Sequence, residues 1–192
     1  LKDENTAAIG ITGQMHGIVY LDKSLRAVSP LFTWQDGRGN LPYKNGTYAS
    51  FLNSFTGYGN VTHFYNETNK IIPENAVLYC TIHDYAAARL AGRKSPVMHV
   101  SDAASLGGFD IKNNKFTDKN PFLPETTDTA EKLGEWHGIP VYTAIGDNQA
   151  SFIGSGCNDG CVLVNIGTGS QVSFSVNEPI TADGLETRPL SD

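Results

Sequence analysis

The stretch "NAVLYCTIHDYAAARLAG", residues 75–92, decides the fold class because it passes from a strand pattern to a helix pattern. Its first part, residues 75–82, is an apolar run typical of a buried strand. Residues 83–92 form an amphipathic helix pattern that ends at Gly92, the residue type most often found just past a helix. A strand that leads into an amphipathic helix indicates an α/β layer protein rather than a sandwich or a helical bundle.

Strand and helix patterns alternate on both sides of this stretch. Before it, the sequence predicts strands at 6–13, 17–22 and 31–37 and an interrupted helix at 48–55 and 61–70. After it, we predict a helix, strand and turn over 100–116, a strand and helix over 139–156, and strands at 160–167 and 170–176. The polar stretch 117–134 is predicted to be a surface connection. We expect one domain over 1–143 and the beginning of a second over 144–192.

Composition excludes several classes of protein. The chain has 192 residues, of which 40% are hydrophobic and 18% charged, a balance typical of a soluble globular protein. The net charge of −6 includes no basic stripe, so we expect no nucleic-acid partner. No apolar run is long enough to cross a bilayer, so we expect no membrane association. The chain starts at Leu1, and we expect it to be part of a larger protein.

The three cysteines, Cys80, Cys157 and Cys161, are few and odd in number, and they form no C-x-x-C motif. No histidine lies at metal-ligand spacing from them. We therefore expect neither a disulfide framework nor a protein-bound metal, and we expect a reducing cytoplasm as the compartment.

Asp147 follows the apolar run of residues 139–146, just where a helix is predicted to begin. In open α/β sheets, ligands bind in the crevice beyond the carboxyl ends of the strands, which favours a functional acid here. The same position suits an Asp that only caps the helix. Both interpretations stay open on the residues alone.

The turn between the last two predicted strands, "GTGS", contains Gly167, Thr168, Gly169 and Ser170. Glycines with nearby hydroxyls can surround a phosphate with bare backbone N–H groups. They also serve as an ordinary tight hairpin turn. The chain has neither a Walker A motif nor the spacing of a dinucleotide-binding fingerprint, so both of those nucleotide sites are set aside.

The segment "GQMHG" places Gln14, Met15 and His16 between two glycines at a strand end. A histidine at such a place either serves a site or is a satisfied structural residue.

The segment "TWQDGR" places an aromatic ring, an amide, an acid and a guanidinium within five positions. Trp34 offers an apolar face, and Gln35, Asp36 and Arg38 can pair with hydroxyl groups, as a sugar site requires. An ion pair between Asp36 and Arg38 on a turn is the alternative.

In this order, the segments resemble the FGGY carbohydrate kinases, sugar kinases of the ribonuclease H-like, actin-like ATPase fold. The resemblance runs nearly from end to end, although each motif alone is weak. The segments that carry it are "GITGQMHG", "TWQDGR", "IHDYAAARLAG", "SDAASLGGFDI", "AIGDNQASFIGSG" and "VLVNIGTGSQVSF".

The resemblance implies a role for each site residue. Asp147 matches the catalytic acid that accepts the proton of the attacking sugar hydroxyl. The implied sugar-binding residues are Gln14, Met15, His16, Trp34, Asp36, Arg38 and Asn148. The implied ATP phosphate-binding residues are Gly167, Thr168, Gly169 and Ser170. The implied ligands are a sugar, ATP and Mg²⁺, and a homodimer stays open.

The resemblance also has departures. The family begins with an Asp-x-Gly-Thr hairpin that grips phosphate and carries a late Gly-rich adenosine segment, and this sequence has neither. We therefore expect the 192 residues alone not to turn over ATP. The complete enzyme is expected to phosphorylate a ketose, with sedoheptulose to sedoheptulose 7-phosphate as the first expectation. Another sugar such as xylulose is the first alternative, and a non-catalytic sugar-binding regulator is the second.

Overall fold

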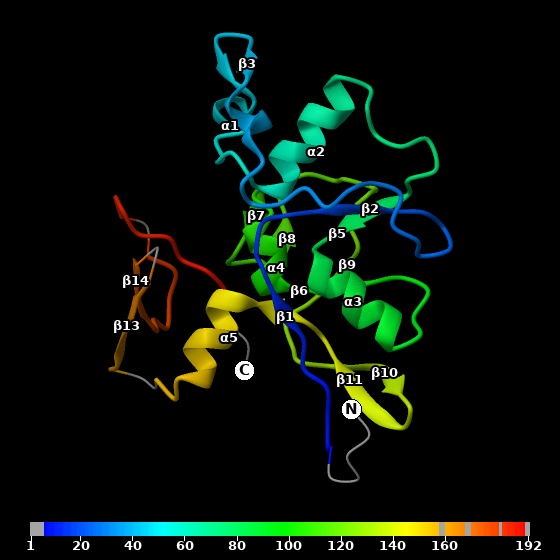
Figure 1. The fold of residues 1–192 in the computed structure, drawn as a ribbon. Helices are drawn as coiled ribbons and strands as arrows, with labels where there is room; N and C mark the ends of the chain where they lie inside the picture. The colour runs from blue at the N-terminus through cyan, green and yellow to red at the C-terminus, as the bar shows by residue number, and fades with distance from the viewer. Residues whose placement is uncertain (1–5, 158–159, 168–169, 181, 191–192) are drawn as a thin grey trace.

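The computed structural model describes residues 6–157, 160–167, 170–180 and 182–190, and it has the predicted alternation of strands and helices (Figure 1). The helices are the 3₁₀ helix η1 (Gly37–Asn40), α1 (Tyr48–Phe51), α2 (Gly59–Thr68), α3 (Ile82–Leu90), α4 (Val100–Ser105) and α5 (Asp147–Gly154). The strands are β1 (Thr12–Gly13), β2 (Val19–Leu21), β3 (Pro42–Tyr43), β4 (Gly46–Thr47), β5 (Leu78–Cys80), β6 (Val97–His99), β7 (Phe109–Asp110), β8 (Lys115–Phe116), β9 (Glu125–Thr127), β10 (Lys132–Trp136), β11 (Ile139–Tyr142), β12 (Ile145–Gly146), β13 (Val162–Ile166) and β14 (Ser170–Phe174). No helix in these described ranges has the length and apolarity needed to cross a membrane.

A parallel pair of strands forms the frame of the candidate site. β1 pairs with β12, with Thr12 opposite Ile145 and Gly13 opposite Gly146. Backbone hydrogen bonds continue this alignment along the preceding residues, because the N–H of Ile145 donates to the carbonyl of Ile11 at 3.2 Å. Two segments more than 130 positions apart in the sequence therefore run side by side in the same direction.

Helices α3 and α4 pack against this frame and its neighbouring strands. α3 contacts β1, β6, β10 and β11, and α4 contacts β6, β9 and β12. α3 begins where predicted because Thr81 caps it, its Oγ1 accepting from the N–H of Asp84 at 3.2 Å. α3 ends at Leu90, and Gly92 has φ +68°, the left-handed conformation expected of a glycine just past a helix.

The largest core cluster lies where β2 and β5 pair antiparallel. All three residues of β2 are buried, because the strand is covered on both faces. Tyr20, Tyr79 and Leu106 expose none of their surface. Truncation of a fully buried Leu such as Leu106 to Ala costs about 2–5 kcal/mol of the free energy of unfolding, so this cluster is a main source of stability.

Two sequence predictions are wrong in detail. The predicted strand 31–37 is reduced to one bridge between Phe32 and Ile18, and the chain then turns into η1. The reason is local, since the Asp36 carboxylate accepts from the Arg38 N–H at 3.0 Å and starts the 3₁₀ turn. The predicted surface connection 117–134 contains β9, which pairs parallel with β6, and most of β10, which pairs with β11. The domain division between residues 143 and 144 stays a prediction.

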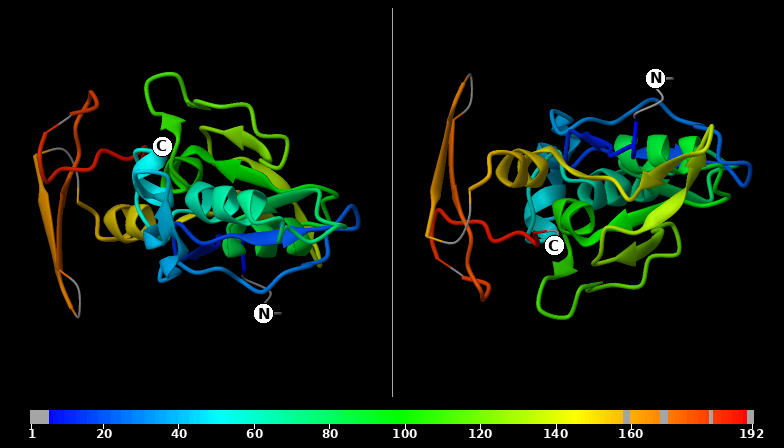
Figure 2. Two further views of the ribbon diagram at one scale, coloured as in Figure 1. Left: turned by 90° about the horizontal axis from the view of Figure 1, so that it is seen from above. Right: turned by 90° about the horizontal axis from the view of Figure 1, so that it is seen from below.

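The β13–β14 hairpin stands away from the rest of the chain, beyond α5 (Figure 2). Its two predicted strands pair antiparallel, with Ile166 opposite Ser170. Ile166 is 81% exposed and Val172 64% exposed, so this apolar hairpin has little packing against the described residues. The segment after β14 runs back from the hairpin to the body of the molecule in both views.

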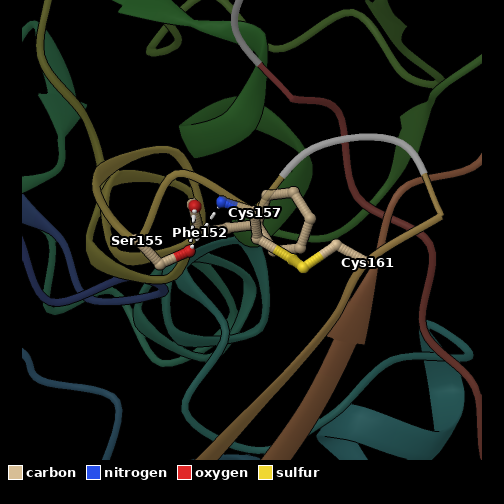
Figure 3. Close-up of a disulfide and its surroundings, with 4 residues drawn as sticks. All are labelled: Phe152, Ser155, Cys157 and Cys161. Atoms are coloured by element: carbon tan, nitrogen blue, oxygen red, sulfur yellow. Dashed lines mark hydrogen bonds between the residues drawn. A yellow bond between two sulfur atoms is a disulfide. The ribbon is translucent and has the colours of Figure 1, made fainter.

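A disulfide joins Cys157 and Cys161 just after α5, with the two Cα atoms 5.5 Å apart (Figure 3). The turn is held locally, because the N–H of Cys157 donates to Ser155 Oγ at 3.2 Å and that hydroxyl donates to the carbonyl of Phe152 at 2.7 Å. The expectation of unpaired cysteines is therefore wrong for this pair, because the turn at the helix end brings them within bonding distance. Cys80 is free and buried. The pairing removes one reason for expecting a reducing compartment.

Candidate active site

The pairing of β1 with β12 carries two predicted site segments to the same edge. Gln14, Met15 and His16 follow β1, and Asp147 follows β12. Because parallel strands end at the same edge, the two segments meet beyond it. Gly146 allows this approach, since a Cβ there would lie 2.9 Å from Met15 Cγ. Met15 is buried and Gln14 is half-buried.

Asp147 is exposed at the first turn of α5. Gly146 occupies the N-cap position, and no side-chain hydrogen bond caps the helix. The capping interpretation is therefore wrong, and no described residue forms a hydrogen bond with the Asp147 carboxylate. The helix N-terminus favours a negative charge at this place. Asp147 thus presents a carboxylate beyond the strand ends.

His16 is held in a specific orientation by α4. Its backbone N–H donates to Ser105 Oγ at 3.2 Å, and its Nδ1 lies 2.6 Å from the Ser105 carbonyl oxygen. Since a carbonyl can only accept, Nδ1 carries the proton. His16 has φ +73°, a conformation that costs a non-glycine residue about 1–3 kcal/mol. These contacts with Ser105 support that backbone conformation.

The protonation state of His16 follows from its surroundings. Burial lowers the pKa of His16, and the positive charge of Arg188 acts in the same direction. The Ser105 carbonyl and the charges of Glu186 and Asp147 oppose this shift without reversing it. The imidazole is therefore neutral at pH 7, and its Nε2 is a hydrogen-bond acceptor.

The segment 33–38 forms a turn with an ion pair between Asp36 and Arg38, which the sequence analysis gave as the alternative to a sugar site. Arg38 Nε lies 2.7 Å from Asp36 Oδ1, and the Arg38 guanidinium lies 4.4 Å from the centre of the Phe32 ring and also donates to Asn66. Trp34 is 54% exposed. Its backbone lies against Gly57, where a Cβ would be 2.0 Å from the Trp34 carbonyl oxygen. A sugar-binding role of this segment stays a prediction.

The hairpin and the helix share one cleft of about 780 Å³. Asn148 and Ser170, both predicted site residues, line it. Gly167 is exposed next to the hairpin turn. Thr168 and Gly169 lie outside the described residues. Asn148, predicted to bind the sugar, and Ser170, predicted to bind phosphate, therefore line the same cleft.

Three residues that the sequence analysis did not select complete this region. The Tyr58 ring stacks on the His16 ring, with centres 4.3 Å apart and planes 12° apart. The Tyr58 hydroxyl donates to Glu186 Oε1 at 2.9 Å, and Arg188 Nη2 lies 2.7 Å from Glu186 Oε2. Arg188 Nη1 donates to Met15 Sδ at 3.2 Å. No sequence motif marks these residues, because their roles depend on segments that meet only in the folded chain.

Known proteins resemble this chain over most of its length. Human sedoheptulokinase is 31% identical over 212 residues, which cover 90% of this chain and 43% of the human protein. Xylulose kinase from Klebsiella pneumoniae is 28% identical, over 88% of this chain and 40% of its own length. The chain resembles the FGGY carbohydrate kinases over most of its length.

The fold agrees with this resemblance. The ligand-bound xylulose kinase from Lactobacillus acidophilus matches it with a TM-score of 0.74 at 17% identity, over 92% of this chain and 42% of that protein. The likeness shows the actin-like ATPase fold that the sequence predicted. No family model matches the sequence. The chain spans less than half the length of these relatives.

A buried charged cluster lies behind β1. His83 Nε2 is 2.9 Å from Asp102 Oδ1, an ion-pair distance that falls outside the geometry of a linear hydrogen bond. Burial favours the neutral imidazole, but the charges of Asp102 and Asp84 outweigh it and raise the pKa of His83 to about 9. Burial and the Asp102 charge raise the pKa of Asp84 well above its usual range.

Ligand atoms of His83, Asp84 and Asp102 lie within 4.8 Å of one another, as in a metal site. Because a metal ligand must be a neutral imidazole, a metal ion could bind here only by displacing the proton that the raised pKa of His83 favours. Without a metal ion, the cluster is an ion pair of His83 with Asp102, beside the buried carboxyl group of Asp84.

Proposed function

We propose that the protein carrying this chain transfers a phosphoryl group from ATP to a hydroxyl group of a ketose. The observation that supports the proposal is the β1–β12 pairing, which brings His16 and the unpaired carboxylate of Asp147 to one strand edge. The resemblance to FGGY carbohydrate kinases supports the same reaction. The neighbouring cleft, of about 780 Å³, is lined by Asn148 and Ser170, which are predicted to contact the sugar and the ATP phosphates.

Asp147 would accept the proton of the attacking sugar hydroxyl. Phosphoryl transfer to a hydroxyl is catalysed mainly by alignment and charge neutralisation, with one carboxylate placed for the departing proton. The exposed Asp147 carboxylate has no capping bond to give up before it meets the substrate. General-base catalysis of this kind contributes about 10²–10⁴ in rate.

His16 would orient the sugar. Its Nδ1–H is committed to the Ser105 carbonyl, so Nε2 can accept a hydrogen bond from a sugar hydroxyl. The lowered pKa of His16 keeps Nε2 unprotonated at pH 7. Alignment by a fixed acceptor lowers the entropy cost of bringing the hydroxyl to Asp147.

ATP would enter as its Mg²⁺ complex and supply the transferred phosphoryl group. Two predicted residues suit the phosphate groups of ATP. Gly167 is exposed, and Ser170, which carries a hydroxyl, lines the cleft. Asp147 is the only predicted site residue besides Asp36 with a carboxylate, and Asp36 is paired with Arg38. We therefore treat Mg²⁺ as part of the nucleotide substrate.

Sedoheptulose is the first candidate substrate, with phosphorylation at the 7-hydroxyl. The supporting observation is the 31% identity to human sedoheptulokinase. Xylulose is the alternative, because xylulose kinases are among the similar proteins. A panel of ketoses offered to the full-length gene product with Mg-ATP tests this, with kcat/KM highest for sedoheptulose as the expected result. Turnover of none of the ketoses, with retained sugar binding, would favour the non-catalytic regulator. The cytoplasmic location, the homodimer and the inactivity of the 192-residue chain alone stay predictions.

A further inference from the structure

The segment after the β13–β14 hairpin places an ion pair directly against the proposed sugar site. Glu186 and Arg188 are separated by one residue, and their side chains pair at 2.7 Å. This pair reaches the first half of the chain at two points, Tyr58 and Met15. The backbone of the segment is anchored nearby, because Gln149 Nε2 donates to the Pro189 carbonyl at 3.3 Å. The pair is therefore fixed between the His16 loop and α5.

The charge states of the three polar groups are set by their contacts. Burial alone would raise the pKa of Glu186, but its bonds with Arg188 and Tyr58 lower it below its usual range. Burial and the Glu186 charge raise the pKa of Tyr58 to about 12. At neutral pH the group thus consists of a carboxylate, a guanidinium and a protonated phenol. The side chain of Arg188 is 20% exposed and that of Glu186 47% exposed, so solvent-side atoms remain open to a ligand.

This set has the chemistry of a polyol site. A carboxylate accepts several hydrogen bonds and a guanidinium donates up to five, so together they match hydroxyls that both donate and accept. The stacked rings of Tyr58 and His16 add an aromatic wall, as small-molecule sites combine apolar walls with a few placed polar groups. Glu186 and Arg188 line the same cleft as Asn148.

We propose that Glu186 and Arg188, oriented by Tyr58, bind hydroxyls of the sugar other than the one that is phosphorylated, and so determine which sugar is accepted. The inference rests on the proposed function. A site that binds a substrate hydroxyl through placed polar groups discriminates against an analogue that lacks this hydroxyl, because the polar groups then lose a partner.

The test measures kcat and KM of the full-length gene product for sedoheptulose, for xylulose and for Mg-ATP. Glu186→Gln and Arg188→Lys keep the size of each side chain and remove the carboxylate charge or the planar fork. We expect the sugar KM to rise about tenfold or more in each variant, and the ratio of kcat/KM between the two sugars to change by a similar factor. The KM for ATP should change by less than about twofold.

Glu135→Gln is the matched control, because Glu135 forms an exposed ion pair with Lys132 at 2.6 Å on β10. Tyr58→Phe keeps the ring stack and removes the hydroxyl that binds Glu186, so it should give a smaller change in the same ratio. An unchanged ratio in both charge variants, or an equal rise for the two sugars and ATP, would overturn the inference. If the wild-type enzyme phosphorylates no ketose, the proposed function itself is wrong. Sugar-induced shifts in melting temperature then show whether Glu186 and Arg188 still select among bound sugars.

Discussion

His83 Nε2 lies 2.9 Å from Asp102 Oδ1, and neither side chain exposes more than 1% of its surface. The pair joins α3 to α4 directly behind β1, where a Cβ on Gly13 would lie 2.9 Å from His83 Nδ1. Asp102 belongs to the same short helix as Ser105, whose hydroxyl and carbonyl hold His16. A buried ion pair therefore supports the loop that carries the proposed sugar ligand.

The first prediction concerns stability against pH. The pKa of His83 is about 9 in the folded chain, above its usual value of 6.5. The stability that protonation contributes is therefore fully present below pH 6.5 and is lost as the pH rises through 9. The loss is about 3 kcal/mol at most, at 1.36 kcal/mol per pKa unit. Urea unfolding of the chain at several pH values in this range measures it.

Two variants of His83 separate charge from shape. His83→Gln leaves Asp102 buried without its cation and should cost about 3–5 kcal/mol at pH 6.5. His83→Lys keeps a cation with a higher reference pKa, so it should retain more stability and move the loss to higher pH. Any loss of stability with rising pH that remains in the Gln variant is assigned to Asp84. Its raised pKa also makes the folded chain less stable as the pH rises. A Gln variant with the full pH dependence of the wild type would contradict the assignment.

The second prediction concerns Asp147. Asp147→Asn in the full-length enzyme should lower kcat at least a hundredfold, because the amide cannot accept the hydroxyl proton. The KM for the sugar should change far less. The exposed Asp128 supplies the control, as Asp128→Asn removes an equal charge away from the site. A variant at position 147 that keeps more than a tenth of normal turnover would exclude the base role.

The third prediction concerns His16. Asn tolerates the left-handed backbone at φ +73° but cannot place an acceptor where Nε2 lies. His16→Asn should therefore raise the sugar KM about two- to tenfold, the worth of one hydrogen bond. His137 also has a positive φ, of 50°, so His137→Asn controls for the backbone effect.

The pH dependence of the wild type checks the same residue. Protonation of His16 would remove the Nε2 acceptor, so kcat/KM for the sugar should fall on the acid side. Because burial lowers the pKa of His16, that fall should lie below pH 6.5. A fall centred above pH 7 would show that another group controls binding.

The fourth prediction concerns the cysteines. Alkylation of the unfolded chain without reductant should label one thiol, that of Cys80, and alkylation after reduction should label three. Because the loop spans only four positions, replacement of both Cys157 and Cys161 by Ser should cost no more than about 2 kcal/mol in the chain-entropy model. Three labels without reductant would show that the chain does not keep this bond.

Periodicity and turn chemistry were enough to predict most of the elements. The pattern of residues 75–92 predicted β5, α3 and the glycine after it, because strand burial, helix amphipathicity and capping are all local properties. The predicted strand over 31–37 failed for a local reason as well. The side chain of Asp36 competes for the Arg38 N–H, which the hydrophobic pattern does not reveal.

The sequence by itself determined the α/β alternation and the candidate segments around His16 and Asp147, because residue types and spacing are properties of short stretches. Only the tertiary structure decided that these segments share an edge, since the parallel pairing of β1 with β12 joins residues far apart in the chain. It also decided the neutral tautomer of His16 and the protonated state of His83, which depend on the carbonyl of Ser105 and the carboxylate of Asp102. Burial and long-range partners set those charge states, and neither can be read from a residue's neighbours in sequence.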